Sequence, residues 1–347
     1  MKCQYTYTDK SNQTWSCGMQ PWEKSKDNYC IFHEPRTDKP KLEFNQKLLT
    51  QLKGKGNNPR NCFYGYCFCG DNSENQISFK KICFHQPVYF NEAKFYGNTS
   101  FKNVIFKNKV IFDKININQK SEILFNNITF KDTVNCNQIQ ENGMLIFDNT
   151  SFFKEVNFEN NYFNNFILKN SAFQKSSTID LVKSHFESIT NIANCIFENE
   201  VRFYHSTFDG NVYLINNTFE EKTFFQGANF RRQLICENNI FKYPEDQEFI
   251  CRKARNTWEK VGDKEQADYY FILERRAKRK QLGLSFNNNS LFFKLHKKIE
   301  KIFNNFTLLL KKLNLYALGQ FIFRFFEWLL ADVTTGYGTR WLRLLFW

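Results

Sequence analysis

Apolar residues recur along the middle of the chain at alternating intervals of five and six residues. The first run consists of phenylalanines, namely Phe79, Phe84, Phe90, Phe95, Phe101, Phe106 and Phe112. After a two-residue insertion the pattern resumes at Phe125, and a later run is unbroken from Leu181 to Phe241. The underlying period is eleven residues. A fixed period predicts a repeat protein, in which each unit stacks on its neighbours to bury its apolar side chains.

The repeat favours short strands over helices. An eleven-residue period also suits a right-handed helical supercoil, but residues five apart on a helix are separated by about 140°, so the two Phe series would not share one face. Phe, Asn, Thr, Val and Ile fill the segment, and they favour strands and turns. The residue two before a repeat Phe is often small or β-branched, as at Ala93, Val110 and Ser184. Alternation by two places both side chains inside a coil of very short strands.

The strings VYFNEAKFYGNTSFKNVIF and VRFYHSTFDGNVYLINNTFEEKTFFQGANF resemble pentapeptide-repeat proteins of the eleven-residue, Phe-centred type, and the resemblance covers residues 77–243. It implies a mainly β fold, a right-handed quadrilateral β-helix in which the central Phe and the residue two before it point inward. Departures from the pattern at 113–124, 137–146 and 164–180 predict local bulges or loops. A β-sandwich with accidental Phe spacing is the alternative.

The charge and motifs of the repeat segment bear on its activity. The best-known activity in the family is mimicry of DNA by an acidic surface that binds topoisomerase, but residues 77–243 carry 18 basic and 16 acidic side chains, which do not copy a phosphate backbone. Neither a P-loop nor a G-x-G-x-x-G fingerprint occurs. His185 and His205 are expected to be exposed coil residues without catalytic partners. The sequence therefore predicts a non-enzymatic scaffold that binds an unidentified protein partner or a second copy of itself.

Cys3, Cys17, Cys30 and His33 have the spacing of a metal site. Cys and His three apart on a turn form a half-site, and the long intervals before Cys30 allow Cys3 and Cys17 to complete a tetrahedral shell. Few aliphatic residues surround them, so a metal would supply most of the folding energy. The segment also resembles small Cys/His knuckles that precede pentapeptide repeats. We expect residues 1–40 to be a structural zinc knuckle; scattered reduced thiols are the alternative. The odd number of cysteines, 11, favours a reducing cytoplasm.

A second group of cysteines follows in the segment 41–76, which we interpret as a linker and solenoid cap, and just after it. The group consists of Cys62, Cys67, Cys69, Cys83 and His85. Two interpretations stay open. The residues bind a second zinc ion, or they are small apolar residues that cover the first coil.

The pattern changes to helical spacing after Pro244. Phe249, Ile250, Ala254, Trp258 and Val261 lie on one face of an expected helix. The sequence predicts a stop at Gly262 and a new start at Asp263. The resulting hairpin over 244–282 resembles the one that follows pentapeptide repeats fused to ion-channel domains, and we expect it to cap the open end of the solenoid.

Residues 283–347 read as basic amphipathic helices near a membrane. Within Tyr270–Lys312 there are 11 basic and 2 acidic side chains, which indicates an anionic partner surface. Phe and Leu residues face the opposite side, as in a membrane-surface helix. Arg324 and Glu327 interrupt the apolar stretch that follows, so we expect an interfacial segment rather than a span. The predicted membrane-binding residues are Lys294, Lys297, Lys298, Lys301, Lys311, Lys312, Arg340 and Arg343.

The string TTGYG at 334–338 resembles the selectivity filter of potassium channels. Nine residues follow it, whereas a membrane span needs about 20. We therefore expect a peripheral protein on the inner, cytoplasmic face of the membrane. Two alternatives stay open: the cytoplasmic portion of an ion-channel-type protein that lacks, or is truncated before, its spans, and a nucleic-acid-binding protein that uses the basic helices.

Overall fold

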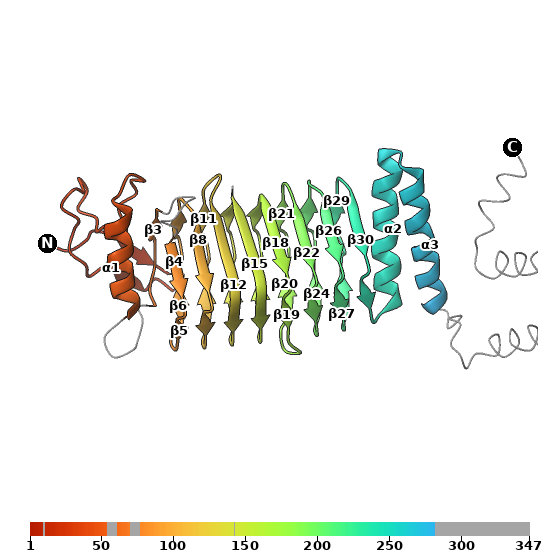
Figure 1. The fold of residues 1–347 in the computed structure, drawn as a ribbon, viewed down its shortest axis with the longest axis horizontal. Coiled ribbons are helices and arrows are strands. Elements are labelled where there is room, and N and C mark those ends of the chain that lie inside the picture. The colour runs from red at the N-terminus through yellow and green to blue at the C-terminus, as the bar shows by residue number, and fades with distance from the viewer. Residues whose placement is uncertain (10, 54–60, 70–76, 142, 282–347) are drawn as a thin grey trace, which may run out of the picture. The chain divides into compact units, whose positions relative to one another are not determined.

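The computed structural model describes residues 1–9, 11–53, 61–69, 77–141 and 143–281. The chain divides into two compact units, Met1–Asp246 and Gln247–Trp347. The first unit contains an N-terminal hairpin, the helix α1 (Lys41–Lys53) and a β-solenoid. The predicted mainly β fold with C-terminal helices is thereby confirmed (Figure 1). The hand of the coil and its quadrilateral cross-section stay predictions.

Four stacks of parallel strands form the solenoid. The first stack comprises β4 (Ile77–Lys80), β8 (Thr99–Lys102), the first parts of β12 (Glu122–Phe130) and β15 (Met144–Phe152), β18 (Asn165–Lys169), β22 (Thr190–Ala193), β26 (Val212–Ile215) and β30 (Leu234–Glu237). The second stack comprises β5 (Cys83–Phe84), β9 (Ile105–Phe106), the last parts of β12 and β15, β19 (Ala172–Phe173), β23 (Ile196–Phe197), β27 (Thr218–Phe219) and β31 (Ile240–Phe241). Because β12 and β15 run through both stacks, these strands form one 14-stranded sheet.

The other two stacks are separate sheets. The 7-stranded sheet comprises β6 (Val88–Tyr89), β10 (Val110–Ile111), β13 (Val134–Asn135), β16 (Val156–Asn157), β20 (Ile179–Asp180), β24 (Val201–Arg202) and β28 (Thr223–Phe224). The 8-stranded sheet comprises β3 (Cys67–Phe68), β7 (Lys94–Phe95), β11 (Asn116–Ile117), β14 (Gln140–Glu141), β17 (Tyr162–Phe163), β21 (His185–Phe186), β25 (Thr207–Phe208) and β29 (Asn229–Phe230).

The strand register explains the period and its departures. Val110 pairs with Val88, so one coil of 22 residues contains two eleven-residue units. Ile123 pairs with Thr99, a spacing of 24, and the two extra residues lie between β11 and β12, inside the departure predicted at 113–124. Insertions also fall within 164–180, between β19 and β20. The loop predicted at 137–146 is wrong, because β14 and the start of β15 occupy this segment in register.

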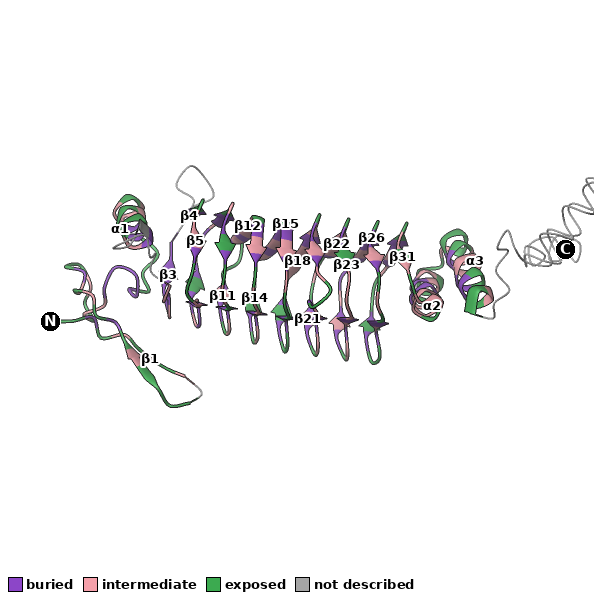
Figure 2. Cartoon of the chain, turned by 90° about the horizontal axis from the view of Figure 1, so that it is seen from below, coloured by how far each residue is buried: buried purple, intermediate pink, exposed green. Residues whose placement is uncertain are grey.

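Phenylalanine rings fill the solenoid interior. Phe79, Phe101, Phe125 and Phe147 stack in one column, with ring centroids 4.4, 4.7 and 4.8 Å apart. Each of these rings is buried, as are the residues two before them, and buried residues alternate with more exposed ones along the long strands β12 and β15 (Figure 2). Aromatic pairs contribute about 0.5–1.5 kcal/mol beyond the burial of their area. The predicted inward positions are confirmed.

The corners of the coil account for the abundant asparagine. One residue per eleven-residue unit lies in the left-handed region. Gly227 has a φ of 71°, and φ is between 51° and 60° at Lys81, Glu92, Asn103, Lys114, Asn127, Gln138, Asn149, Asn160, Asn170, Lys183, Asn194, His205, Asn216 and Asn238. Asn is the most frequent of these because its short side chain tolerates the left-handed region. The side chains also form a ladder, in which Asn127 Nδ2 donates to Asn103 Oδ1 at 2.6 Å and Asn216 Nδ2 to Asn194 Oδ1 at 3.1 Å.

Two helices follow the solenoid, α2 (Pro244–Val261) and α3 (Lys264–Gln281). Gly262, with a φ of 84°, ends α2, and Asp263 begins α3 because its Oδ1 accepts the Gln266 N–H at 3.0 Å. Both predicted boundaries are confirmed. Arg255 Nη1 on α2 lies 2.9 Å from Glu274 Oε2 on α3. That the hairpin covers the end of the solenoid stays a prediction.

Of the helices that the structure describes, none combines the length and the apolar character that a membrane span requires. The basic helices, the interfacial segment and the TTGYG string expected at 283–347 lie outside the described residues.

Candidate metal centre

A short hairpin positions the first two cysteines. β1 (Thr6–Thr8) and β2 (Thr14–Ser16) pair antiparallel, and Asp9 Oδ1 stabilises the turn between them by accepting the N–H groups of Ser11 and Gln13. Beyond the strands the pairing continues, since the Cys17 N–H donates to the Tyr5 carbonyl at 3.0 Å and the Cys3 N–H to the Met19 carbonyl at 2.8 Å. The hairpin therefore places Cys3 and Cys17 side by side.

A tight turn positions the other two side chains. The N–H groups of His33 and Glu34 both donate to the Cys30 carbonyl at 3.0 Å. This turn brings Cys30 Sγ to 3.1 Å from His33 Nδ1, as the C-x-x-H spacing predicts. The Cys30 N–H also donates to Cys3 Sγ at 3.1 Å, which ties the turn to the hairpin.

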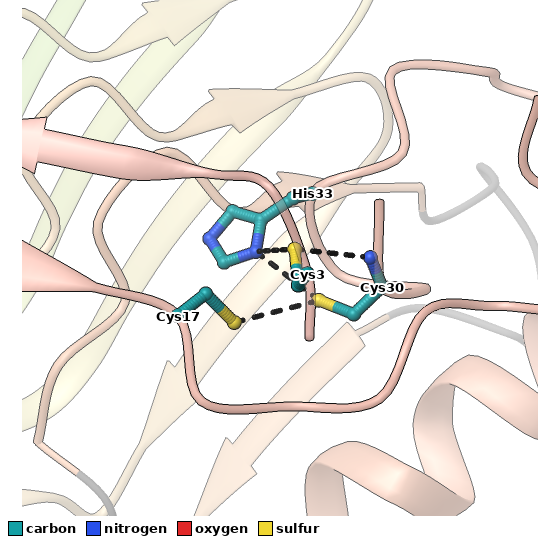
Figure 3. A group of neighbouring side chains, drawn as sticks. All are labelled: Cys3, Cys17, Cys30 and His33. Atoms are coloured by element: carbon teal, nitrogen blue, oxygen red, sulfur yellow. Dashed lines mark hydrogen bonds between the residues drawn. The ribbon is translucent and has the colours of Figure 1, made fainter. Parts of the chain in front are cut away.

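The four predicted ligands converge on one point. Their three sulfur atoms and one ring nitrogen all lie within 4.8 Å of one another. Cys17 Sγ is 3.9 Å from Cys30 Sγ, and Cys3 Sγ is 3.5 Å from His33 Nδ1. All four residues are between 1 and 6% exposed. Figure 3 shows their side chains pointing toward one another. Such a group can hold a metal ion.

The surroundings of His33 fix its tautomer. His33 Nε2 lies 2.8 Å from the Tyr64 carbonyl oxygen, which can only accept a hydrogen bond, so the ring proton sits on Nε2. Nδ1 therefore presents its lone pair to the three sulfurs. Tyr5 stacks on the imidazole with ring centroids 4.1 Å apart, and Tyr66 contacts it edge-on at 5.1 Å. A metal-ligating His held by a carbonyl on its other nitrogen is the usual arrangement at zinc sites.

The sulfurs perturb one another. Hydrogen bonding with Cys17 lowers the pKa of the Cys3 thiol, while Cys17 raises the pKa of the Cys30 thiol and Cys3 raises that of Cys17. Several negative charges in one buried place repel, so the three thiols oppose one another's ionisation. A divalent cation at the centre would remove this repulsion and allow all three to bind as thiolates. The donor set, three sulfurs and one imidazole nitrogen, fits tetrahedral zinc.

The Cys/His cluster lies against the first coil, which begins earlier than the sequence pattern predicted. Phe63 stacks on Phe90 at 4.7 Å and Phe68 on Phe95 at 4.9 Å, so the aromatic columns extend back from Phe79. The five-residue spacing of Phe63 and Phe68 matches that of Phe90 and Phe95, but 27 residues separate the stacked partners instead of 22, so the pair falls outside the period of the sequence. Residues 61–69 therefore belong to the solenoid itself.

The second predicted ligand set is not brought together. Among the residues that the structure describes, Cys3, Cys17, Cys30 and His33 form a group of potential metal ligands, and Cys62, Cys67, Cys69, Cys83 and His85 do not. Cys67 and Cys69 are buried with their thiols against backbone carbonyls, whereas Cys83 is half-buried on the outer side of β5 and His85 is exposed. Burial raises the pKa of the Cys67 thiol to about 11. These residues support the cap interpretation over the second zinc.

The histidines of the solenoid differ from one another. His205 is exposed, as expected, and occupies a left-handed corner. The exposed position expected for His185 is wrong, because it is half-buried in β21, stacks on Tyr162 at 4.9 Å and lies 3.3 Å from Asp209 Oδ2. The eight predicted membrane-binding residues, from Lys294 to Arg343, lie outside the described residues.

We compared the chain with known protein families, sequences and structures. No protein-family model, no curated protein sequence and no solved structure matches this chain.

Proposed function

We propose that this chain is a non-enzymatic pentapeptide-repeat scaffold whose N-terminal end is held by a structural zinc ion at Cys3, Cys17, Cys30 and His33. The observation that carries the proposal is the convergence of these buried ligands, with His33 Nδ1 directed at three sulfurs. Four protein ligands leave no open position for substrate or water, which suits a structural ion and not a catalytic one. Bound zinc would cross-link the hairpin to the Cys30–His33 turn.

The proposal of a scaffold is supported by the buried polar side chains of the solenoid, which form hydrogen bonds with the backbone of other coils. Ser184 Oγ accepts the Asn161 N–H at 3.2 Å and donates to the Phe158 carbonyl at 2.8 Å. In the same way Asn217 Oδ1 accepts the Cys195 N–H at 2.9 Å. These side chains bind neighbouring coils and are therefore committed to structure. A stack of such coils is a rigid surface suited to binding a protein partner.

Metal analysis of the purified full chain tests the zinc site. We expect about one zinc per chain, and we expect Cys17→Ser to lose it. Cys195→Ser is the matched control, because Cys195 is equally buried but lies inside the solenoid, where burial raises its pKa to about 12. Zinc-free protein whose residues 1–40 remain folded would contradict the proposal, and so would equal loss of zinc in both variants.

A second role is proposed for the C-terminal segment, which we place on the inner face of the membrane in the cytoplasm. Among the described residues, the proposal is supported by the last turn of α3. This turn carries Lys278, Arg279 and Lys280 and leads into the basic segment of the sequence. Each basic residue near an anionic leaflet contributes about 1 kcal/mol, so several together make a salt-dependent anchor.

Flotation with vesicles tests this role. We expect the full chain to float with anionic vesicles at low salt and to be released from them at high salt. It should not bind neutral vesicles. Replacing Lys297, Lys298 and Lys301 by Glu should abolish flotation. The same change at the exposed Lys80, Lys102 and Lys107 of the solenoid should not. Binding to DNA without binding to vesicles would favour the nucleic-acid alternative, and flotation that resists high salt would favour a membrane-inserted, channel-type protein.

A further inference from the structure

The outer side of the 14-stranded sheet carries two rows of uncharged side chains. The outward residues of the first stack are Ser78, Ser100, Leu124, Ile146, Ile167, Asn191, Tyr213 and Ile235. Those of the second stack are Cys83, Ile105, Thr129, Ser151, Ala172, Ile196, Thr218 and Ile240. Because β12 and β15 run through both stacks, the two rows lie on one face of the solenoid, which we call the flat face.

The flat face is apolar and uncovered within the unit Met1–Asp246. None of the residues in its two rows is charged, although 24% of the residues of the chain are. Ile105, Ile196 and Ile240 are 41, 48 and 64% exposed. Among the described residues of this unit, no helix or strand lies over the face (Figure 2). Its isoleucines contribute little to the folding of one chain, and an exposed apolar patch of this kind is typical of an interaction surface.

Charged side chains lie beside these rows, and their sign changes along the solenoid. They occupy the row between the two stacks and the row that follows the second stack. Before β15 the described positions of these rows carry basic residues and no acidic one, and the basic residues are Lys80, Lys102, Lys107 and Lys131. After β18 the acidic residues are Glu198, Glu220 and Glu237. At the boundary Asp148 Oδ2 lies 3.6 Å from Lys169 Nζ, and at the far end Lys242 Nζ lies 2.8 Å from Glu221 Oε1. One half of the face is therefore basic and the other acidic.

A second copy turned end to end matches this charge pattern. The matching twofold axis runs along the strand direction between β15 and β18, and it sets the first strand of each stack opposite the eighth strand of the same stack in the other copy. The second strand then meets the seventh, and the third meets the sixth. The resulting pairs of opposite charge are Lys80 with Glu237, Lys107 with Glu220, Lys131 with Glu198, and Asp148 with Lys169. Lys102 meets Ile215, on which its aliphatic stem can pack.

The same alignment sets small residues opposite large ones. The pairs are Ser78 with Ile235, Ser100 with Tyr213, Ile105 with Thr218, and Thr129 with Ile196. Side chains of two packed sheets interdigitate, so this alternation of size fills the space between the copies. The face is about 34 Å long and about 20 Å wide at the usual strand spacing and rise, so each copy would bury about 700 Å². A standard protein interface buries about 800 Å² per partner.

From these features we infer that the flat face binds a second copy of this chain, with the two solenoids antiparallel about this twofold axis. The inference rests on the proposed function of a scaffold, and it names the surface and the partner. A partner with a different sequence would not require the charges and the sizes of this face to complement one another in a single alignment.

Charge reversal tests this on the purified full chain, with the mass measured by light scattering and sedimentation at several protein concentrations. We expect the unmodified chain to have the mass of a dimer. Lys107→Glu with Lys131→Glu should weaken dimerisation at least tenfold, because like charges then face one another. Glu198→Lys with Glu220→Lys should have the same effect. Mixing the two variants should restore dimers, since each reversed charge then meets its opposite.

Lys94→Glu with Lys183→Glu is the matched control, because these two lysines are exposed on other sides of the solenoid. This variant should dimerise like the unmodified chain, and circular dichroism verifies that every variant is folded. A monomeric unmodified chain, or a mixture of the two reversed variants without dimers, overturns the inference. Dimers that persist in each reversed variant alone also overturn it, because they use another surface. A monomer that binds zinc defeats the inference alone, whereas a charge-dependent dimer without zinc defeats the zinc proposal alone.

Carbodiimide cross-linking tests the alignment of the two copies. Lys107 follows the second strand of the second stack and Glu220 follows the seventh, which are about 24 Å apart at a strand spacing of about 4.8 Å. An amide bond between these two side chains therefore cannot form within one chain. A mixture of unlabelled and isotope-labelled protein should yield peptides that join Lys107 of one copy to Glu220 of the other. Dimers that give links between copies without this one would overturn the antiparallel alignment.

Discussion

The N-terminal Cys/His cluster and the Phe-filled solenoid differ in how their segments are held together. The solenoid repeats one packing solution, so each coil rests on many stacked rings such as Phe101 between Phe79 and Phe125. Residues 1–40 contain a single Phe, and their segments meet at four buried ligand atoms and at the ring contacts of Tyr5 with His33 and of Tyr7 with Tyr64. A repeated core spreads its stability over many residues, whereas a single cross-linked centre concentrates it in one place. The two regions should therefore respond differently to the same perturbation.

Removal of the metal should have the largest effect, and it should be confined to the N-terminal region. Binding of structural zinc to small peptides is worth about 10–16 kcal/mol at neutral pH, so we expect residues 1–40 to unfold when the ion is chelated. Limited proteolysis should cleave this region quickly while the solenoid stays intact. Simultaneous loss of both regions would show that the solenoid depends on the metal as well.

Phe101→Ala should have the next largest effect, on the solenoid. The ring is fully buried, and truncation of a buried Phe costs about 3–5 kcal/mol of unfolding free energy. Urea unfolding followed by circular dichroism measures the loss. Ile105→Ala is the control, because Ile105 is 41% exposed, and its change should stay small. Zinc content should be normal in both variants.

Ser184→Ala should destabilise the solenoid less. The change leaves the buried Asn161 N–H without its acceptor, which costs about 1–3 kcal/mol. Ser151→Ala, at a half-buried outward position of β15, should differ little from the unmodified chain in the same urea experiment. A cost equal to that of Phe101→Ala would mean that polar ladders, and not ring stacking, dominate the core.

A change at a corner of the coil should have the smallest effect. Asn194 has a φ of 54°, so Asn194→Val should lower the unfolding free energy by about 1–2 kcal/mol because a β-branched residue resists this conformation. Asn194→Gly keeps the conformation accessible and should cost less, losing mainly the side-chain ladder to Asn170 and Asn216. Thermal unfolding of the two variants side by side measures the difference.

The period of the sequence was sufficient to predict the solenoid. Because the coils stack in register, each coil places its buried apolar residues at the same positions. The period did not reveal that Phe63 and Phe68 belong to the first coil, since the neighbouring cysteines suggested metal chemistry instead. The missing Phe within 137–146 led to the prediction of a local bulge or loop there. The described backbone of this segment keeps the register of the coils.

The convergence of the Cys/His cluster was predictable to the extent that its members share local structure. Cys30 and His33 share one turn, so their spacing was informative. The partner that orients His33 is the Tyr64 carbonyl in another segment, and sequence spacing does not encode this contact. Sequence spacing also misled at the second set of cysteines. Cys67 and Cys83 are close in the sequence, but they lie on different stacks and Cys83 faces outward.

X-ray absorption at the zinc edge of the purified full chain tests the central claim most directly. Three sulfur ligands at about 2.3 Å and one nitrogen ligand at about 2.0–2.1 Å are expected, with the signal lost in Cys17→Ser and retained in Cys195→Ser. An oxygen-rich shell, or a sulfur shell that survives Cys17→Ser, would contradict the assignment of Cys3, Cys17, Cys30 and His33 as the site that holds the N-terminal region together.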